Sequence, residues 1–229
     1  MWSRRAFLEY GSYTLAAMTS LETRAAAQPG TGPLGRPIGL QLYTVREDAA
    51  KNLPATLKTI AAIGYREVEL AGMPPVKAAE LRTMLSDLGL TAPSMHAGMG
   101  DLQSGLQERI DYAKALGTQH IVCAFPWTAD SRFRTGGSQA LAAGITLADW
   151  QWNADQLNRI GELTRKAGIR CGYHNHNMEF RTYDGLADGL TAFDELLKRT
   201  DPQLVTIELD IAWVVTAGID PLQVLRKHP

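Results

Sequence analysis

Two histidines stand two residues apart in the stretch CGYHNHNMEF, residues 171–180. Because side chains alternate along a β-strand, His174 and His176 are expected on the same side of a strand, where they would share one site. Imidazole binds divalent metal ions and also transfers protons near neutral pH. The stretch therefore predicts one wall of a metal or proton-transfer site.

Further polar side chains follow short apolar runs elsewhere in the chain. Taken singly, each fits the end of a strand that meets solvent, and a lone histidine is more often a hydrogen-bonded structural residue than a ligand. Taken together they indicate a shared site, because the carboxyl ends of parallel barrel strands converge on one face. Carboxylates and imidazoles on one face predict a divalent-metal site. These polar residues are Gln41, Tyr43, Glu67, Glu69, His96, His174, His176, Glu208 and Asp210.

From residue 38 onward, short apolar runs alternate with amphipathic stretches of about ten residues or more. This alternation predicts right-handed βαβ units and a parallel sheet. An open doubly wound sheet and a (β/α)₈ barrel both fit, and both place their chemistry at strand ends. The region of the first run reads LQLYTVREDAAKN and holds no glycine, which disfavours a dinucleotide-binding turn. The predicted strands are 38–44, 66–72, 91–97, 120–126, 169–176 and 204–213.

The stretch between the fourth strand and the next helix is long, covering residues 126–149. Long loops without structure of their own are uncommon and often functional. Because this one follows a strand, it is expected on the face of the candidate site, where Trp127 would cover a substrate. A mobile insertion is the alternative. The predicted helices are 53–64, 75–89, 106–117, 152–168 and 190–200.

The N-terminal segment differs in character from the rest of the chain. It contains SRRAFL, which resembles the twin-arginine export signal, and its AAA before Gln28 suits a cleavage site. We expect a signal peptide over 1–27, a Gly- and Pro-rich linker over 28–37 and a barrel domain over 38–229. Export would place the protein in the periplasm or outside the cell. A disordered, partly helical leader is the alternative.

The overall composition is that of an ordinary globular protein, with 45% hydrophobic and 21% charged residues among 229, which is enough for a sizeable core. A net charge of −1 offers no electrostatic footprint for nucleic acid or an anionic membrane. No apolar run approaches the roughly 20 residues of a membrane span. Cys123 and Cys171 fall in separate predicted strands and are expected as buried thiols, although export would permit their oxidation.

Four stretches resemble the sugar phosphate isomerase/epimerase group of the xylose isomerase-like TIM barrels: IGLQLYTVRE, GYREVEL, YHNHNMEF and LDIAWVVTAG. The similarity runs from Ile38 to Pro229. It implies an α/β fold of the (β/α)₈ TIM-barrel type with about six βα units, an incomplete barrel. It also implies a divalent metal ion at the barrel mouth, which is Mn²⁺, Mg²⁺, Co²⁺ or Zn²⁺, and a small sugar as substrate. Homo-oligomerisation is left open.

The resemblance also implies particular metal ligands. Asp210 matches the ligand of the sixth strand, and His174 falls where the group carries the glutamate of the fifth. That change removes a carboxylate base and makes His176 and Glu179 alternative ligands. Trp213, three residues beyond Asp210, would pack on the sugar.

The implied reaction is proton transfer beside a carbonyl. The metal would stabilise an enediolate, and a carboxylate or histidine would move the proton. The outcome is isomerisation, epimerisation or elimination. The residues implied in catalysis are His174, Glu69 and His176; those implied in substrate binding are His96, Trp127, Trp213 and Tyr43.

The end of the chain departs from the group's pattern. The group's seventh and eighth strands supply two further ligands, whereas this sequence ends at DPLQVLRKHP, where the seventh strand would begin. We therefore expect a C-terminally truncated member whose site lacks those ligands, and a natural six-stranded fold is the alternative. The rival hypotheses are a sugar-binding or inactive fragment and, disfavoured by the near-neutral charge, an endonuclease IV-like phosphodiester hydrolase.

Overall fold

The computed structural model describes residue 32 and residues 35–134 and 137–228. Contacts divide the chain into two units, 1–38 and 39–229. The predicted signal peptide lies outside the described residues, so export and localisation stay predictions. In the first unit, the Gly35 N–H donates to the Gly32 carbonyl at 3.0 Å. No helix in the described ranges has both the length and the apolar character needed to cross a membrane.

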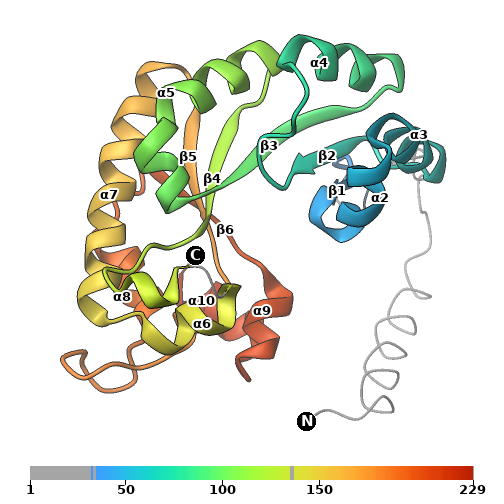
Figure 1. Ribbon diagram of the computed structural model, residues 1–229. Coiled ribbons are helices and arrows are strands. Elements are labelled where there is room, and N and C mark those ends of the chain that lie inside the picture. The colour runs from blue at the N-terminus through green and yellow to red at the C-terminus, as the bar shows by residue number, and fades with distance from the viewer. Residues whose placement is uncertain (1–31, 33–34, 135–136, 229) are drawn as a thin grey trace, which may run out of the picture. The chain divides into compact units, whose positions relative to one another are not determined.

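The second unit is built on a six-stranded parallel sheet, whose strands follow one another in the order of the chain. Figure 1 shows this sheet curving past the helices that connect its strands. The arrangement confirms the predicted α/β fold with six βα-type units, an incomplete barrel. The strands are β1 (Gly39–Gln41), β2 (Glu67–Leu70), β3 (Thr91–Gly98), β4 (His120–Phe125), β5 (Arg170–His174) and β6 (Val205–Glu208).

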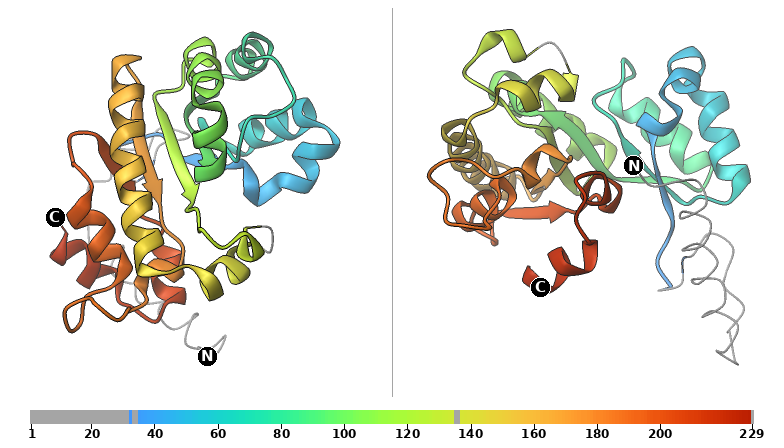
Figure 2. Two further views of the ribbon diagram at one scale, coloured as in Figure 1. Left: turned by 60° about the vertical axis from the view of Figure 1, so that its left-hand side comes forward. Right: turned by 90° about the horizontal axis from the view of Figure 1, so that it is seen from below.

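Helices α5 and α7 pack on the same side of the sheet, α5 against β3 and β4 and α7 against β5 and β6 (Figure 2). Helix α7 begins with a capping box, in which the Thr146 hydroxyl and the Asp149 carboxylate each accept the other residue's backbone N–H. The helices are α2 (Arg46–Lys51), α3 (Leu53–Ile63), α4 (Ala78–Asp87), α5 (Met99–Leu116), α6 (Gly137–Gly144), α7 (Leu147–Lys166), α8 (Ala192–Arg199), α9 (Ile211–Thr216) and α10 (Pro221–Lys227), with 3-10 turns η1 (Leu42–Val45), η2 (Ser131–Phe133) and η3 (Met178–Phe180).

The two faces of the sheet carry different side chains. On the helix side, apolar residues such as Leu70, Met95 and Tyr173 are fully buried in one cluster with residues of α5 and α7. Residues on the other face alternate with these along each strand. The strand register pairs Gln41 with Glu69 and His174 with Glu208 on that face. The apolar core therefore lies under the helices, and the polar groups gather on the opposite face.

A buried glycine brings α7 close to the chain that leads into β6. A Cβ atom at Gly161 would lie 2.7 Å from the carbonyl oxygen of Leu204, a separation that real Cβ atoms essentially never show. Leu204 immediately precedes β6. The missing side chain thus sets the distance between the helix and the start of this strand.

Several sequence predictions of element boundaries were wrong. The run 38–44 is not one strand, because β1 ends at Gln41 and residues 42–45 form η1. The run 204–213 is not one strand, because Asp210 accepts the Trp213 N–H and starts helix α9. The strand predicted over 169–176 ends at His174, so His176 lies in the following loop. The stretch 126–149 is not structureless, since it contains η2, α6 and the start of α7.

The two cysteines match their prediction. Cys123 lies in β4 and Cys171 in β5, and both are buried free thiols. Burial raises the pKa of Cys123, and it raises the pKa of Cys171 to about 12, so neither thiol ionises near neutral pH.

Candidate active site

Three side chains converge on the polar face of the sheet. Glu208 Oε1 lies 2.8 Å from His174 Nδ1 and 2.9 Å from His96 Nε2. One potential ligand atom from each residue falls within 4.8 Å of the other two. They come from the ends of β5 and β6 and from β3, and the direct pairing of His174 with Glu208 in the register explains their approach. We call His96, His174 and Glu208 the metal cluster.

A second set of hydrogen bonds joins the metal cluster to the first strands. Glu69 Oε1 lies 3.0 Å from His96 Nε2 and accepts a hydrogen bond from Gln41 Nε2 at 2.9 Å. The Ser94 hydroxyl donates to the other carboxylate oxygen of Glu69. Since Glu69 pairs with both Gln41 and Ser94 in the register, one inward layer of the sheet forms a continuous polar network.

His96 is subject to opposing electrostatic effects. Burial lowers its pKa, but the hydrogen bonds with Glu208 and Glu69 outweigh that cost and raise the pKa to about 9. Gln41 works against protonation, because its Oε1 accepts the Tyr43 N–H and its Nε2 therefore faces His96 Nδ1 at 3.2 Å. An imidazole that accepts at Nδ1 carries its proton on Nε2, which then donates to the carboxylates.

The carboxylate of Glu208 is held in its charged form. Burial raises its pKa, but hydrogen bonds from His174 and His96 outweigh burial and hold the pKa well below its usual range. At neutral pH the metal cluster therefore presents an ionised carboxylate between two histidine rings. Sequence reasoning placed Glu208 among the strand-end residues but did not select it as a ligand.

Asp210 lies beside the metal cluster rather than within it. Its Oδ2 is 3.9 Å from His174 Nε2, while its Oδ1 accepts the Trp213 N–H at 3.1 Å. The fully buried Asn175 fixes its backbone by accepting the Asp210 N–H at 2.8 Å and donating to the Asp210 carbonyl at 3.2 Å. The supporting role of Asn175 could not be predicted from the sequence, because its hydrogen-bond partner Asp210 is 35 residues away.

His176 reaches the site from the loop after β5. Its ring centroid lies 5.1 Å from that of His174, 5.1 Å from that of Trp213 and 4.8 Å from that of Phe125. Burial, followed by the nearby His174, lowers the pKa of His176 to about 4, so its ring is neutral at pH 7. Its Nδ1 is buried without a hydrogen-bond partner among the described residues. This nitrogen is an unpartnered hydrogen-bonding group within the site, which donates or accepts according to the tautomer of the ring.

Glu179 supports the loop that carries His176. It is fully buried, accepts the His176 N–H at 2.9 Å and accepts the Tyr173 hydroxyl at 2.7 Å. Burial raises its pKa to about 7. Since both oxygens already accept hydrogen bonds, the geometry makes Glu179 a support for the turn and not a free ligand.

Two aromatic residues predicted to bind substrate occupy different surroundings. Tyr43 is 61% exposed in the turn after β1, with the Arg46 guanidinium 4.5 Å from its ring centroid. Trp127 is partly buried, with its ring centroid 4.6 Å from that of Trp152 and the Arg134 guanidinium 4.3 Å from its ring. The sequence did not reveal that Trp127 is engaged in this way, because neither partner is adjacent to it.

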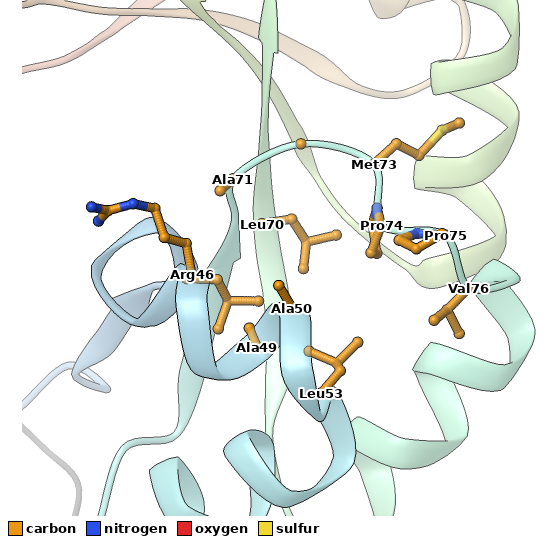
Figure 3. A pocket seen from close by; sticks show the side chains of 12 residues that line it. Arg46, Ala49, Ala50, Leu53, Leu70, Ala71, Met73, Pro74, Pro75 and Val76 are labelled. Carbon is orange, nitrogen blue, oxygen red and sulfur yellow. The ribbon is translucent and has the colours of Figure 1, made fainter.

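A separate apolar pocket of about 440 Å³ lies between α2 and the loop after β2 (Figure 3). Leu42 and Leu70 line it, whereas the preceding residues Gln41 and Glu69 belong to the polar network on the opposite face. Figure 3 shows the Arg46 guanidinium directed away from the labelled apolar side chains. This pocket offers apolar packing and stands apart from the metal cluster.

The donor set of the metal cluster fits a divalent cation. Imidazole nitrogens and a carboxylate oxygen are the usual protein ligands of Zn²⁺, and mixed nitrogen and oxygen sets also hold Mn²⁺ or Co²⁺. The ionised Glu208 supplies the negative charge, and Asp210 is close enough to His174 to add a second carboxylate. Because imidazole binds metal in its neutral form, a cation would compete with the proton on His96.

Fold and site together define a parallel α/β protein of the barrel type with a metal-competent cluster at its strand ends. Residues 57–228 match the xylose isomerase-like TIM barrel family, and the chain belongs to it.

Curated relatives carry enzyme names. The chain is 23% identical over 181 residues to the inosose dehydratase of Geobacillus kaustophilus, which covers 75% of this chain and 57% of that protein. It is 32% identical over 85 residues to inosose dehydratase 2 of Bacillus cereus, covering 37% of this chain and 26% of that protein. The chain thus spans little more than half of the first relative.

Solved structures support the fold. A sugar phosphate isomerase/epimerase from Parabacteroides distasonis superposes with a TM-score of 0.68 at 24% identity, covering 90% of this chain and 76% of that one. The IOLI protein, solved with a bound zinc atom, gives a TM-score of 0.57 at 13% identity, covering 80% and 65%. At these identities the likeness establishes the shared architecture.

Proposed function

We propose that the chain belongs to a metal-dependent enzyme that removes a proton from the carbon next to a carbonyl in a sugar or a related cyclic polyol ketone. The observation that carries this proposal is the convergence of His96, His174 and Glu208 at the sheet's polar face. The enzyme names of the relatives support the reaction class, since both dehydration of an inosose and epimerisation of a sugar can begin with such a proton.

Glu208 and His174 are proposed as the central metal ligands, with Asp210 and His96 beside them. A bound divalent ion supplies a Lewis acid that polarises the carbonyl and stabilises the negative charge that develops on its oxygen. Asn175 holds Asp210 at the required position through its two backbone hydrogen bonds.

The proton is proposed to move through side chains that flank the metal cluster. Glu69 and His96 are hydrogen-bonded to each other, so a proton taken by one is shared with the other. On the other side, the neutral His176 accepts a substrate hydroxyl at Nδ1, and Trp213 and Tyr43 contact the ring of the sugar. Returning the proton to the neighbouring carbon gives isomerisation, and returning it to the opposite face of the same carbon gives epimerisation. Loss of a neighbouring hydroxyl as water gives dehydration.

Metal binding and proton exchange test this proposal together. After dialysis against Mn²⁺ or Zn²⁺, the wild type is expected to retain about one ion per chain, and Glu208→Gln to bind at least about tenfold more weakly. Glu67→Gln is the matched control, because Glu67 lies at the other end of β2. Equal affinity in Glu208→Gln would exclude the metal cluster as the site.

Deuterium exchange reports the reaction itself. With ketoses and inososes in D₂O, NMR is expected to show exchange at the carbon next to the carbonyl for the metal-loaded wild type and not for His174→Ala. Sugar-dependent thermal stabilisation without any exchange would instead support a sugar-binding module. Metal binding with neither exchange nor sugar binding would support an inactive fragment.

We also propose that the leader directs export through the twin-arginine route, so that the substrate is an unphosphorylated sugar outside the cytoplasm. The support is the SRRAFL sequence and the alanines before Gln28. Replacing Arg4 and Arg5 by lysine is expected to retain the chain in the cytoplasm, as fractionation of cells would measure. Unchanged export would contradict this assignment.

A further inference from the structure

A pocket of about 340 Å³ lies at the end of β4, and its lining residue Phe125 contacts His176 of the candidate active site. It is formed by the start of α5, the end of β4, the chain after β4 and helix α6. Apolar side chains, among them Met99 and Leu141, are buried at its wall. The residues used below are Gly100, Asp101, Phe125, Trp127 and Arg134, and we call this space the side pocket.

Phe125 connects the side pocket to the candidate active site. It lines the pocket and is 40% exposed, so its ring is accessible to a ligand. Its ring centroid lies 4.8 Å from that of His176, which in turn lies 5.1 Å from that of His174. Phe125 is therefore a wall of the side pocket on one side and a neighbour of the candidate active site on the other.

The lining of the side pocket combines apolar walls with two fixed polar groups. The Arg134 guanidinium lies 4.3 Å from the Trp127 ring centroid and donates to the backbone carbonyls of Thr128 and Ala129, both at 2.8 Å. Asp101 contributes a carboxylate held by Arg109 at 3.1 Å. Arginine has five N–H donors, so the two used here leave others for a ligand.

This combination matches a polyhydroxylated ring. Such a ring presents C–H groups on its faces, which pack on aromatic and aliphatic side chains, and hydroxyls at its edge, which bond to carboxylates and guanidinium groups. A wholly apolar ligand would form no hydrogen bonds with Asp101 and Arg134, and a small ion would not contact the apolar walls.

We propose that the side pocket is a second sugar subsite, which receives a ring linked to the reacting sugar, so that the substrate is a disaccharide or other glycoside and not a free monosaccharide. The identity of the reacting sugar rests on the proposed function. The side pocket itself is an observed feature of the chain, and its occupancy is measured separately from metal binding and proton exchange.

Gly100 lines the side pocket and is the position at which volume can be added to its wall. It is the second residue of α5, and a Cβ added there would meet nothing within 4 Å. Gly100→Leu therefore adds a side chain at the pocket wall without a steric clash and, as a helical position, gains helix propensity over glycine. Ala79→Leu is the matched control, because Ala79 is the exposed second residue of α4.

The test compares maltose and cellobiose with glucose, using calorimetric titration of the Mn²⁺-loaded chain. At least one disaccharide is expected to bind about tenfold or more tightly than glucose. Gly100→Leu should remove that advantage while leaving metal content and glucose binding unchanged, and Ala79→Leu should retain it.

Two results would overturn the second subsite. One is equal or absent binding of both disaccharides relative to glucose, and the other is a disaccharide advantage that persists in Gly100→Leu. Neither result changes the metal stoichiometry or the D₂O exchange, which report the proposed function. Loss of metal binding with an intact disaccharide advantage would overturn the proposed function and leave the subsite standing.

Discussion

The two faces of strands β3, β5 and β6 satisfy their side chains in opposite ways. On the helix side, Met95 and the ring of Tyr173 are fully buried in the apolar cluster, and the Tyr173 hydroxyl donates to Glu179. One residue further along the same strands, His96 and His174 face Glu208 and are stabilised by hydrogen bonds and charge. The difference shows how a single strand serves two purposes. Successive side chains point to opposite faces of the sheet, so the apolar core and the polar site lie on different faces. In β3 and β5, one residue packs in the core and the next residue reaches the metal cluster.

The largest expected effect is a difference in unfolding free energy between variants of two neighbouring residues of β5, one on each face of the sheet. Tyr173→Ala should cost about 3–5 kcal/mol of unfolding free energy, because it leaves a cavity in the core, whereas His174→Ala should cost about 1 kcal/mol. Urea unfolding measures both. Metal binding should be lost only in His174→Ala. Equal losses of stability would break the distinction between the faces.

A smaller effect tests whether the polar face is held by its own supports. Asn175→Ala should weaken metal binding about 10–100-fold, since Asn175 fixes the backbone of Asp210. Asn175→Asp keeps the acceptor for the Asp210 N–H and should fall between the wild type and alanine. A folded Asn175→Ala with wild-type metal affinity would show that Asp210 needs no such support.

The smallest effect concerns pH. The pKa of His96 is raised to about 9, so its interaction with Glu69 and Glu208 stabilises the metal-free protein fully below about pH 6.5 and is lost as the pH rises through about 9. The loss should be on the order of 1 kcal/mol. Glu208, whose pKa is lowered, limits the same interaction on the acid side.

His96→Gln should flatten this dependence between pH 6.5 and 9 when urea unfolding is repeated across that range. His120→Gln is the matched control, because His120 lies at the other end of a neighbouring strand. An unchanged slope in His96→Gln would assign the pH dependence to other groups.

Much of the fold was predictable because local sequence patterns indicate the strands and helices. The alternation of apolar runs with amphipathic stretches gave the six parallel strands, and His174 and His96 could be placed at strand ends. The choice between Glu208 and Asp210 could not be made from the sequence, since it depends on how β5 and β6 pair laterally. The end of β5 at His174 depended on the turn that Glu179 stabilises through Tyr173 and the His176 N–H.

The close approach at Gly161 ties the helix layer to the strand that carries Glu208. Glu208 lies four residues beyond Leu204, whose carbonyl oxygen leaves no room for a side chain at position 161. Any larger residue there must shift α7 or the chain that leads into β6. The starting point of the strand that delivers Glu208 therefore depends on the absence of a side chain on the far side of the sheet.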